Sequence, residues 1–109
     1  IKRVRTADGE PIFEENIFVP FDAYRELLTA DLEDKSIFAE VERVGGTPIV
    51  SVGYRTVEAV RANAEQAAEL GIAPHDPLLN LRAGFTGPND EPVLMGKQYY
   101  VGSRYVMVM

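Results

Sequence analysis

Two arginines close to the start of the chain, Arg3 and Arg5, have the spacing of an anion-binding pair. Residues two apart in a strand project from the same face, so two guanidinium groups can converge on one phosphate, sulfate or carboxylate. The alternative is a solvated strand face, on which these cations offset the carboxylates of Glu14 and Glu15. The pattern of charges alone leaves both interpretations open.

The other side chains that could perform chemistry favour binding over catalysis. His75 is the only histidine and cysteine is absent, so the sequence lacks the partners for a catalytic triad or a zinc–thiolate site. His75 belongs to a turn at residues 73–77, which favours a surface position. Glu14 and Glu15 face opposite sides of their expected strand, unlike the paired carboxylates of a glycosidase. We predict a protein that is not an enzyme and holds no cofactor and no metal.

The length and the composition predict one domain. With 109 residues, of which 46% are hydrophobic, the chain can bury a single core. The sequence opens on Ile1 rather than on methionine, and its first residues already have a strand-like pattern. We therefore expect residues 1–109 to be one domain, or most of one, within a longer polypeptide.

The charge distribution and the apolar pattern restrict the partners. The formal net charge is -6, and the cations form no basic stripe of the kind that tracks nucleic-acid phosphates. No apolar run approaches the roughly 20 residues that span a bilayer, and no signal peptide is recognisable. The absence of cysteine fits a reducing compartment. We predict a cytoplasmic domain that by itself binds neither DNA nor a membrane.

The chain is expected to begin with a β-hairpin. Strand-like runs at residues 3–6 and 12–19 flank the pair Asp8-Gly9, in which glycine tolerates the positive φ that such turns demand. Pro20 should end the second strand because proline has no N–H to donate to a ladder.

Two short helices are expected next. The first starts from Asp22 and carries apolar residues at helical spacing as far as Leu32. Ser36 is a candidate N-cap for the second helix, and Gly45 and Gly46 supply its left-handed stop.

The second half of the sequence predicts one more helix among strands. Asn63 caps this helix, Gln66 completes a capping box, and Gly71 ends it. Strand-like runs occupy residues 48–57, 78–86, 93–101 and 105–109, and the last three are expected to pair as an antiparallel meander. The predicted fold class is α+β, an antiparallel β-sheet with short inserted helices.

Several local patterns occur together in one order. They are Arg3-x-Arg5, DGEPIFEENIFVP, the helix start at Ser36, AEQAAELGIAPHDPLLNLRAGF and EPVLMGKQYYVGSRYVMVM. Each pattern is weak alone, but their combined order and spacing make a specific signal. In this combination the chain resembles the effector-binding (UTRA) domain of the HutC-type branch of the GntR family of bacterial transcription regulators.

The resemblance implies a sheet similar to that of chorismate lyase, with a ligand cavity between the sheet and the helices. It also implies that the opening segment of the effector domain and an N-terminal winged helix-turn-helix domain lie outside this chain. Such regulators are typically homodimers that bind operator DNA through the N-terminal domain, and a small anionic effector modulates that binding.

The resemblance also implies which residues line the effector pocket. Carried over by motif position, they are Arg3, Arg5, Glu15, Ser36 and Tyr100. The arginines would neutralise an anion, the serine would offer a helix N-terminus, and the tyrosine would supply a flat wall. Glu15 as a cross-strand partner of an arginine and Ser36 as an ordinary N-cap remain alternatives.

Two departures from the family pattern change the expected ligand. Leu94 stands where members that recognise amino-sugar phosphates tend to carry an acidic residue, and Phe38 stands where they often carry tyrosine. The loss of a carboxylate and a hydroxyl favours an anionic effector with an apolar portion over a polyol phosphate. The sequence leaves two alternatives open, a chorismate-lyase-like enzyme and a dimerisation module that responds to no ligand.

Overall fold

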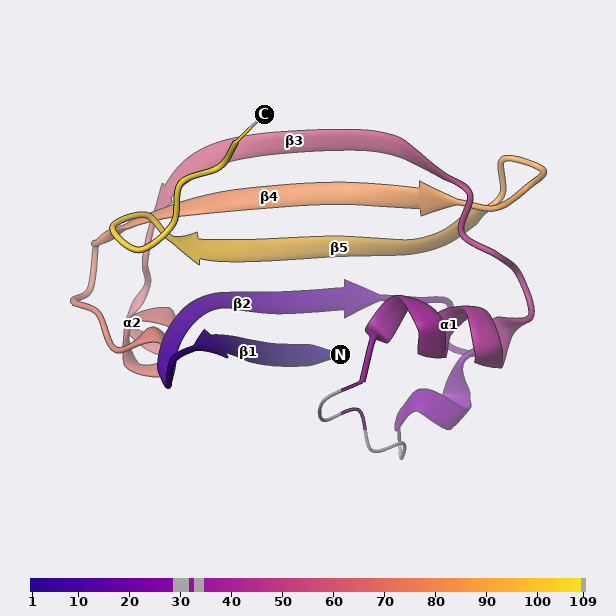
Figure 1. The fold of residues 1–109 in the computed structure, drawn as a ribbon, viewed down its shortest axis with the longest axis horizontal. Coiled ribbons are helices and arrows are strands. Elements are labelled where there is room, and N and C mark those ends of the chain that lie inside the picture. The colour runs from indigo at the N-terminus through magenta and orange to yellow at the C-terminus, as the bar shows by residue number, and fades with distance from the viewer. Residues whose placement is uncertain (29–31, 33–34, 109) are drawn as a thin grey trace.

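Five antiparallel strands form one sheet with the order β1-β2-β5-β4-β3 (Figure 1). A computed structural model describes residues 1–28, 32 and 35–108. The strands are β1 (Lys2–Ala7), β2 (Glu10–Phe18), β3 (Ser51–Arg61), β4 (Pro77–Thr86) and β5 (Pro92–Val101). The structure confirms the predicted α+β class with its antiparallel sheet and short helices.

The first two strands form the predicted hairpin. Ala7 lies opposite Glu10, so Asp8 and Gly9 are the two central residues of the turn. Their φ angles are 53° and 77°, the combination of two positive values that a tight hairpin turn needs. The turn fixes the register that places Arg3 opposite Glu15.

Both well-capped helices occur where the sequence predicts them. In α1 (Ile37–Gly45), the Ser36 side chain accepts a hydrogen bond from the Ala39 N–H, and Gly46 ends the helix in the left-handed region. In α2 (Ala64–Leu70), Asn63 and Gln66 form a reciprocal capping box, and Gly71 is left-handed. These ends depend on short-range contacts, and sequence spacing was therefore sufficient to locate them.

Other predicted boundaries need correction. The helix expected from Asp22 is only a 3-10 helix, η1 (Arg25–Leu28), in the part that the structure describes; residues 29–31 of that expectation lie outside it. The strand expected at residues 48–57 runs instead from Ser51 to Arg61, because β3 pairs with β4 as far as Arg61 opposite Pro77.

The predicted last strand at residues 105–109 is wrong for residues 105–108, which have no strand structure, and Met109 lies outside the described residues. The position beside β5 that a meander would give to this segment is taken by β2, with Tyr100 opposite Phe13. The C-terminal tail, residues 102–108, instead crosses one end of the sheet (Figure 1). The predicted pairing of β4 with β5 is confirmed.

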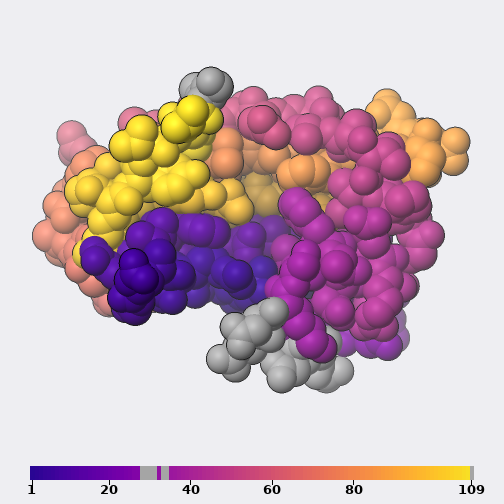
Figure 2. Space-filling view, in the orientation of Figure 1, coloured from indigo at the N-terminus to yellow at the C-terminus, as the bar shows by residue number. Residues whose placement is uncertain are grey.

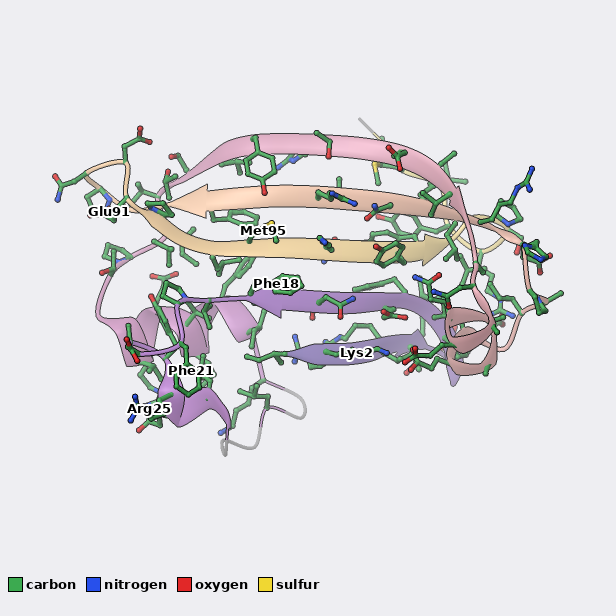
Figure 3. The ribbon with its side chains drawn as sticks, turned by 180° about the vertical axis from the view of Figure 1, so that it is seen from behind. Lys2, Phe18, Phe21, Arg25, Glu91 and Met95 are labelled. Atoms are coloured by element: carbon green, nitrogen blue, oxygen red, sulfur yellow. The ribbon has the colours of Figure 1, made fainter. Side chains whose placement is uncertain are left out.

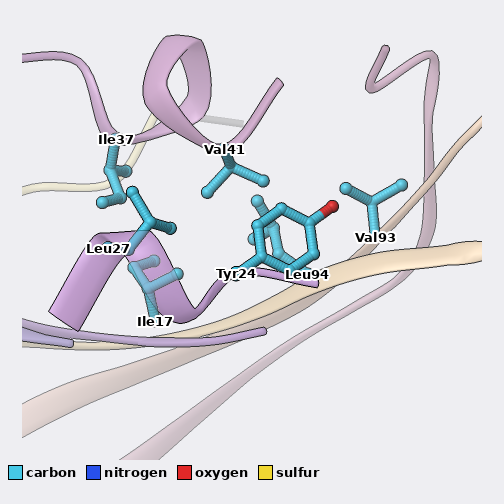
Figure 4. Packing of buried hydrophobic residues seen from close by; sticks show 7 residues of the cluster. All are labelled: Ile17, Tyr24, Leu27, Ile37, Val41, Val93 and Leu94. Carbon is cyan, nitrogen blue, oxygen red and sulfur yellow. The ribbon is translucent and has the colours of Figure 1, made fainter. Parts of the chain in front are cut away.

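The helices cover different parts of the two sheet faces, and each has its own core. On the α1 face, η1 and α1 pack over one end of the sheet through Ile17, Tyr24, Leu27, Ile37, Val41, Val93 and Leu94 (Figure 4). On the other face, α2 packs over the opposite end through Ala62, Ala67, Leu70, Leu78 and Val101. Helix α1 does not cover the middle of the α1 face, where the tail and a cavity lie.

Arg104 fastens the tail to the hairpin and to α2. Its guanidinium donates hydrogen bonds to the carbonyl oxygens of Leu70 at 2.8 Å, Gly71 at 3.2 Å and Pro11 at 3.0 Å. Its Nε lies 2.6 Å from a carboxylate oxygen of Glu10. A cation at the carboxyl end of a helix satisfies carbonyls that lack helical partners.

We expect Arg104→Ala to lower the free energy of unfolding by about 2 to 4 kcal/mol, because several carbonyl acceptors lose a charged donor together. Arg104→Lys should recover part of the loss, since an ammonium cannot reach all of these acceptors in one geometry. Urea unfolding of both variants measures the difference. Equal stabilities of wild type and Arg104→Ala would contradict this role.

Candidate functional site

A cavity of about 400 Å³ lies between the α1 face of the sheet, helix α1 and the C-terminal tail. Its lining comes from every strand except β1: Glu15, Ile17, Phe38, Arg55, Val57, Leu81, Ala83, Phe85, Gly96, Gln98, Tyr105, Met107 and Val108. Figure 2 shows the tail over one end of this face and α1 over the other, with atoms of β4 visible between them. The volume is within the range of small-molecule sites.

Most of the cavity surface is apolar. Ala83, with only a methyl group, lies opposite Gly96, which has no side chain, and this pair leaves room above the middle of the sheet. At the α1 end, the rings of Phe38 and Phe85 pack with centroids 4.9 Å apart. A ligand with an apolar portion can replace water over this surface favourably.

Three polar side chains face this apolar surface: Glu15, Gln98 and Arg55. Gln98 lies opposite Glu15 in the sheet, and its amide donates to Glu15 Oε1 at 3.3 Å. Arg55 extends from β3 on the far side of the cavity and, within residues 1–28, 32 and 35–108, forms no ion pair. The cavity therefore has a carboxylate–amide pair on one side and a guanidinium on the other.

All three nitrogens of the Arg3 guanidinium donate hydrogen bonds within the protein. It donates to Glu15 Oε2 from both Nε, at 3.2 Å, and Nη2, at 2.8 Å. Its Nη1 donates to the carbonyl oxygens of Leu32 at 3.2 Å and Lys35 at 3.1 Å. The Arg3 and Glu15 side chains are 16% and 9% exposed, so this is a partly buried ion pair. Arg3 thus fixes the carboxylate that lines the cavity.

Tyr100 contacts the cavity through its neighbours. Its hydroxyl donates to Gln98 Oε1 at 3.0 Å, and its ring lies between those of Phe13 and Tyr105, with centroid distances of 4.5 and 4.3 Å. Burial raises the pKa of Tyr100, and the Tyr105 and Glu15 side chains add to the effect. The stack holds the tail over the sheet, and the hydroxyl orients the Gln98 amide.

The remaining residues expected at the site lie around the cavity rather than in it. Arg5 projects from the same face of β1 as Arg3 and lines a surface depression along that strand. Ser36 is exposed and caps α1, one residue after the carbonyl that Arg3 binds. Leu94 is 5% exposed and belongs to the core beneath α1.

Of the cavity lining, the sequence identified only Glu15 and Phe38, and the polar residues Arg55 and Gln98 are among those it missed. Gln98 could have been found from the strand register, because it shares its sheet face with Tyr100 and lies opposite Glu15. Arg55 occupies a position in β3 that faces Ala83, and the expected strand contained it without indicating which face was covered. His75, as expected, is an exposed turn residue.

The α2 face carries a separate cluster of charged groups (Figure 3). Lys2 Nζ lies 2.8 Å from Glu69 Oε1, 3.2 Å from Glu65 Oε1 and 4.0 Å from Glu14 Oε1. The Asn16 amide donates to Glu14 Oε1 at 3.0 Å. Burial raises the pKa of Glu14, whereas the hydrogen bond from Lys2 lowers the pKa of Glu69.

We expect Glu14→Gln to stabilise the protein at alkaline pH by about 1 kcal/mol, the scale of one poorly compensated buried polar group. An acid whose pKa is raised by folding stabilises the native state below its unfolded pKa, and this stabilisation is lost as pH rises through the folded pKa. The wild type should therefore lose stability relative to Glu14→Gln as the pH rises from 4 to 8. Thermal melts across this range measure the difference.

Glu69→Gln is the matched control, and its effect has the opposite sign. A carboxyl whose pKa is lowered by folding contributes stability above its unfolded pKa and loses it on acidification. This variant should be less stable than the wild type at neutral pH and should approach it in acid. If the stabilities of the two variants relative to the wild type changed with pH in the same direction, the environments assigned to Glu14 and Glu69 would be contradicted.

No helix in the described part of the chain is long and apolar enough to cross a membrane. Within the same residues, no group of three or more His, Cys, Asp or Glu side chains has the arrangement of a metal site.

Residues 1–106 match the UTRA domain family. The chain is also 32% identical over 108 residues to the HTH-type transcriptional repressor NagR of Bacillus subtilis (strain 168), an alignment that covers 99% of this chain and 44% of that protein. The chain thus spans less than half the length of this curated relative.

Two solved structures share the fold over 99% of this chain. A GntR-family transcriptional regulator from Enterococcus faecalis V583 gives a TM-score of 0.84 at 26% identity, with 76% of that chain covered. The effector domain of PhnF from Mycobacterium smegmatis gives 0.85 at 25% identity, with 67% covered. The sheet, its cavity and these similarities define the class as the effector-binding domain of a transcription regulator. The chain belongs to the UTRA domain family of GntR-type regulators.

Proposed function

We propose that this domain senses a small anionic metabolite in the cavity on the α1 face, within a cytoplasmic, HutC-type regulator. The main support is the cavity itself, which combines an apolar floor with a guanidinium on one side and a carboxylate–amide pair on the other. Such a site suits a ligand with an anionic group, an apolar portion and a hydroxyl or amine. The domain performs no chemical step on this ligand.

Each polar residue has a distinct role in this proposal. Arg55 meets the anionic group, while Glu15 and Gln98 recognise the hydroxyl or amine. Arg3 is a positioning residue, because its donors hold Glu15 and the two carbonyls before α1. Arg5 and Ser36 form a polar rim beside the cavity, and Tyr100 orients Gln98.

The regulatory part of the proposal concerns residues outside this chain. The domain forms a homodimer, and effector binding shifts the dimer between two arrangements. This shift changes the operator affinity of a winged helix-turn-helix domain that precedes residues 1–109. A coupling free energy of about 1 to 3 kcal/mol would change that affinity several-fold or more.

A thermal-shift screen of sugar phosphates, carboxylates and phosphonates tests the proposal. At least one anionic probe should stabilise the protein, and its uncharged analogue should not. Ala83→Met, which fills the cavity floor, should abolish the shift. Stabilisation by no probe, or equal stabilisation by the uncharged analogues, would overturn the proposal. Turnover of a bound probe would favour the enzyme alternative.

A further inference from the structure

The carboxylate–amide pair on one side of the cavity has no net charge once its bound arginine is included. Arg3 donates to Glu15 Oε2 from two nitrogens, at 3.2 and 2.8 Å, so its positive charge offsets that of the carboxylate. Among the described lining residues, the other charged side chain is Arg55, on the opposite side. The groups that a ligand meets therefore sum to a single positive charge, which matches a monoanion.

The hydrogen bonds of this pair determine which polar atoms remain for a ligand. A carboxylate only accepts, so the Gln98 amide group donates to Glu15 Oε1 at 3.3 Å. The Gln98 carbonyl oxygen accepts from the Tyr100 hydroxyl at 3.0 Å. Within the described part of the chain, Gln98 Nε2 keeps one N–H, and Glu15 Oε1 keeps one acceptor site. A donor and an acceptor thus lie side by side at this end of the cavity.

We propose that the effector carries one carboxylate, an apolar body and, at the end opposite the carboxylate, an uncharged hydroxyl group. The carboxylate pairs with Arg55, and the hydroxyl donates to Glu15 Oε1 while it accepts from Gln98 Nε2. A carboxylate has one charge at neutral pH, whereas a phosphate monoester has nearly two. This inference deepens the proposed function and rests on it, because it selects the hydroxyl over the amine at the Glu15 end.

Other end groups fit the Glu15 end of the cavity less well. An ammonium would use only the acceptor, and it would bring a second cation to a carboxylate that is already paired with Arg3. A second carboxylate would lie against Glu15 without a cation of its own. A methyl group would leave both the Gln98 N–H and the Glu15 acceptor site without partners.

The sheet limits the length of the ligand. Glu15 and Val57 occupy one row across β2, β5, β4 and β3, and Arg55 is two positions further along β3. At about 4.8 Å per strand and about 3.3 Å per residue, the Cα atoms of Glu15 and Arg55 are roughly 16 Å apart. Side chains stand roughly perpendicular to a sheet, so two hydrogen bonds of about 2.8 Å leave room for a ligand of up to about 10 Å. A benzene ring with para substituents has a suitable length.

Four para-substituted benzoates test this class, because they share one shape and one anionic group and differ only at the other end. They are 4-(hydroxymethyl)benzoate, 4-(aminomethyl)benzoate, 4-methylbenzoate and terephthalate. Thermal shift and isothermal titration at neutral pH measure their affinities for the wild type. The hydroxymethyl compound should bind at least about tenfold more tightly than each of the other three, since it alone satisfies both the Gln98 N–H and Glu15 Oε1.

Two variants separate recognition of the hydroxyl from recognition of the anion. Gln98→Met removes the amide at a similar side-chain volume and should reduce the preference for the hydroxymethyl over the methyl compound to within about twofold. The affinity for 4-methylbenzoate should stay unchanged. Arg55→Gln is the matched control, and it should weaken binding of all four compounds by a common factor and keep the preference. The wild-type comparison tests the ligand class even if Gln98→Met is unstable.

The outcomes distinguish this inference from the proposed function. If the amine, the methyl compound or terephthalate binds as tightly as 4-(hydroxymethyl)benzoate, the inference is overturned and the proposed function stands. The same holds if another anion of the thermal screen stabilises the protein and none of the four benzoates binds. Full retention of the preference by Gln98→Met would overturn the role of Gln98. If neither the screen nor the benzoates give any binding, the proposed function itself is overturned.

Discussion

Replacing Arg3 with alanine is expected to lower the free energy of unfolding by about 3 to 5 kcal/mol, the range for breaking a buried ion pair from one side. The variant would leave the Glu15 carboxylate, 9% exposed, without its charged partner. It would also remove the donor to the carbonyls of Leu32 and Lys35. Urea unfolding at neutral pH measures the loss.

Arg5→Ala is the matched control for this prediction. Arg5 lies on the same strand and face, but its side chain forms no ion pair within residues 1–28, 32 and 35–108. Its replacement should cost less than about 1 kcal/mol, as for most surface changes. Similar losses of unfolding free energy for the two variants would contradict the assignment of Arg3 as the partner of Glu15 and of Arg5 as a surface residue.

Arg55→Gln is expected to weaken binding of the stabilising anionic probe about 10-fold to 150-fold, the equivalent of about 1.5 to 3 kcal/mol for a charged hydrogen bond. The physical reason is that Arg55 is the cation lining the cavity, whereas the Arg3 guanidinium is occupied by Glu15 and backbone carbonyls. Isothermal titration of the probe found in the thermal screen measures the affinity. The unfolding free energy should change little, because Arg55 is exposed.

Arg61→Gln provides a control of equal charge. Arg61 is an exposed residue at the end of the same strand and is absent from the cavity lining. If the two variants weaken binding equally, the effect is one of net charge and the assignment of Arg55 fails. Loss of the probe's salt dependence in Arg55→Gln alone would support a direct contact.

The parts of the fold predicted from sequence are those fixed by neighbouring residues. The caps at Ser36 and Asn63 and the turn at Asp8-Gly9 depend on contacts within a few positions, so their residue types were informative. The expected strand is wrong for residues 105–108, because alternating valines fit the strand pattern whether or not a partner strand is present. Pairing is a long-range property, and the hairpin strand β2 occupied the edge of β5.

In the candidate site, too, only the features determined by neighbouring residues were predicted from the sequence. Spacing alone put Arg3 and Arg5 on one face, and the structure agrees. Which of the two arginines is engaged within the protein depends on carbonyl oxygens 29 and 32 positions away in the sequence, and no local pattern encodes such contacts. Arg55 could be assigned to the site only once the position of the tail was known, because the cavity lies where the tail covers the α1 face.

The stack of Phe13, Tyr100 and Tyr105 provides an intrinsic fluorescence probe of the domain. The chain has five tyrosines and no tryptophan, so its ultraviolet emission is tyrosine emission alone. One of the two stacked tyrosine rings belongs to a sheet strand and the other to the tail that covers the cavity. A ligand that moves the tail changes the contact between these two fluorophores, so occupancy can be followed without attaching a dye.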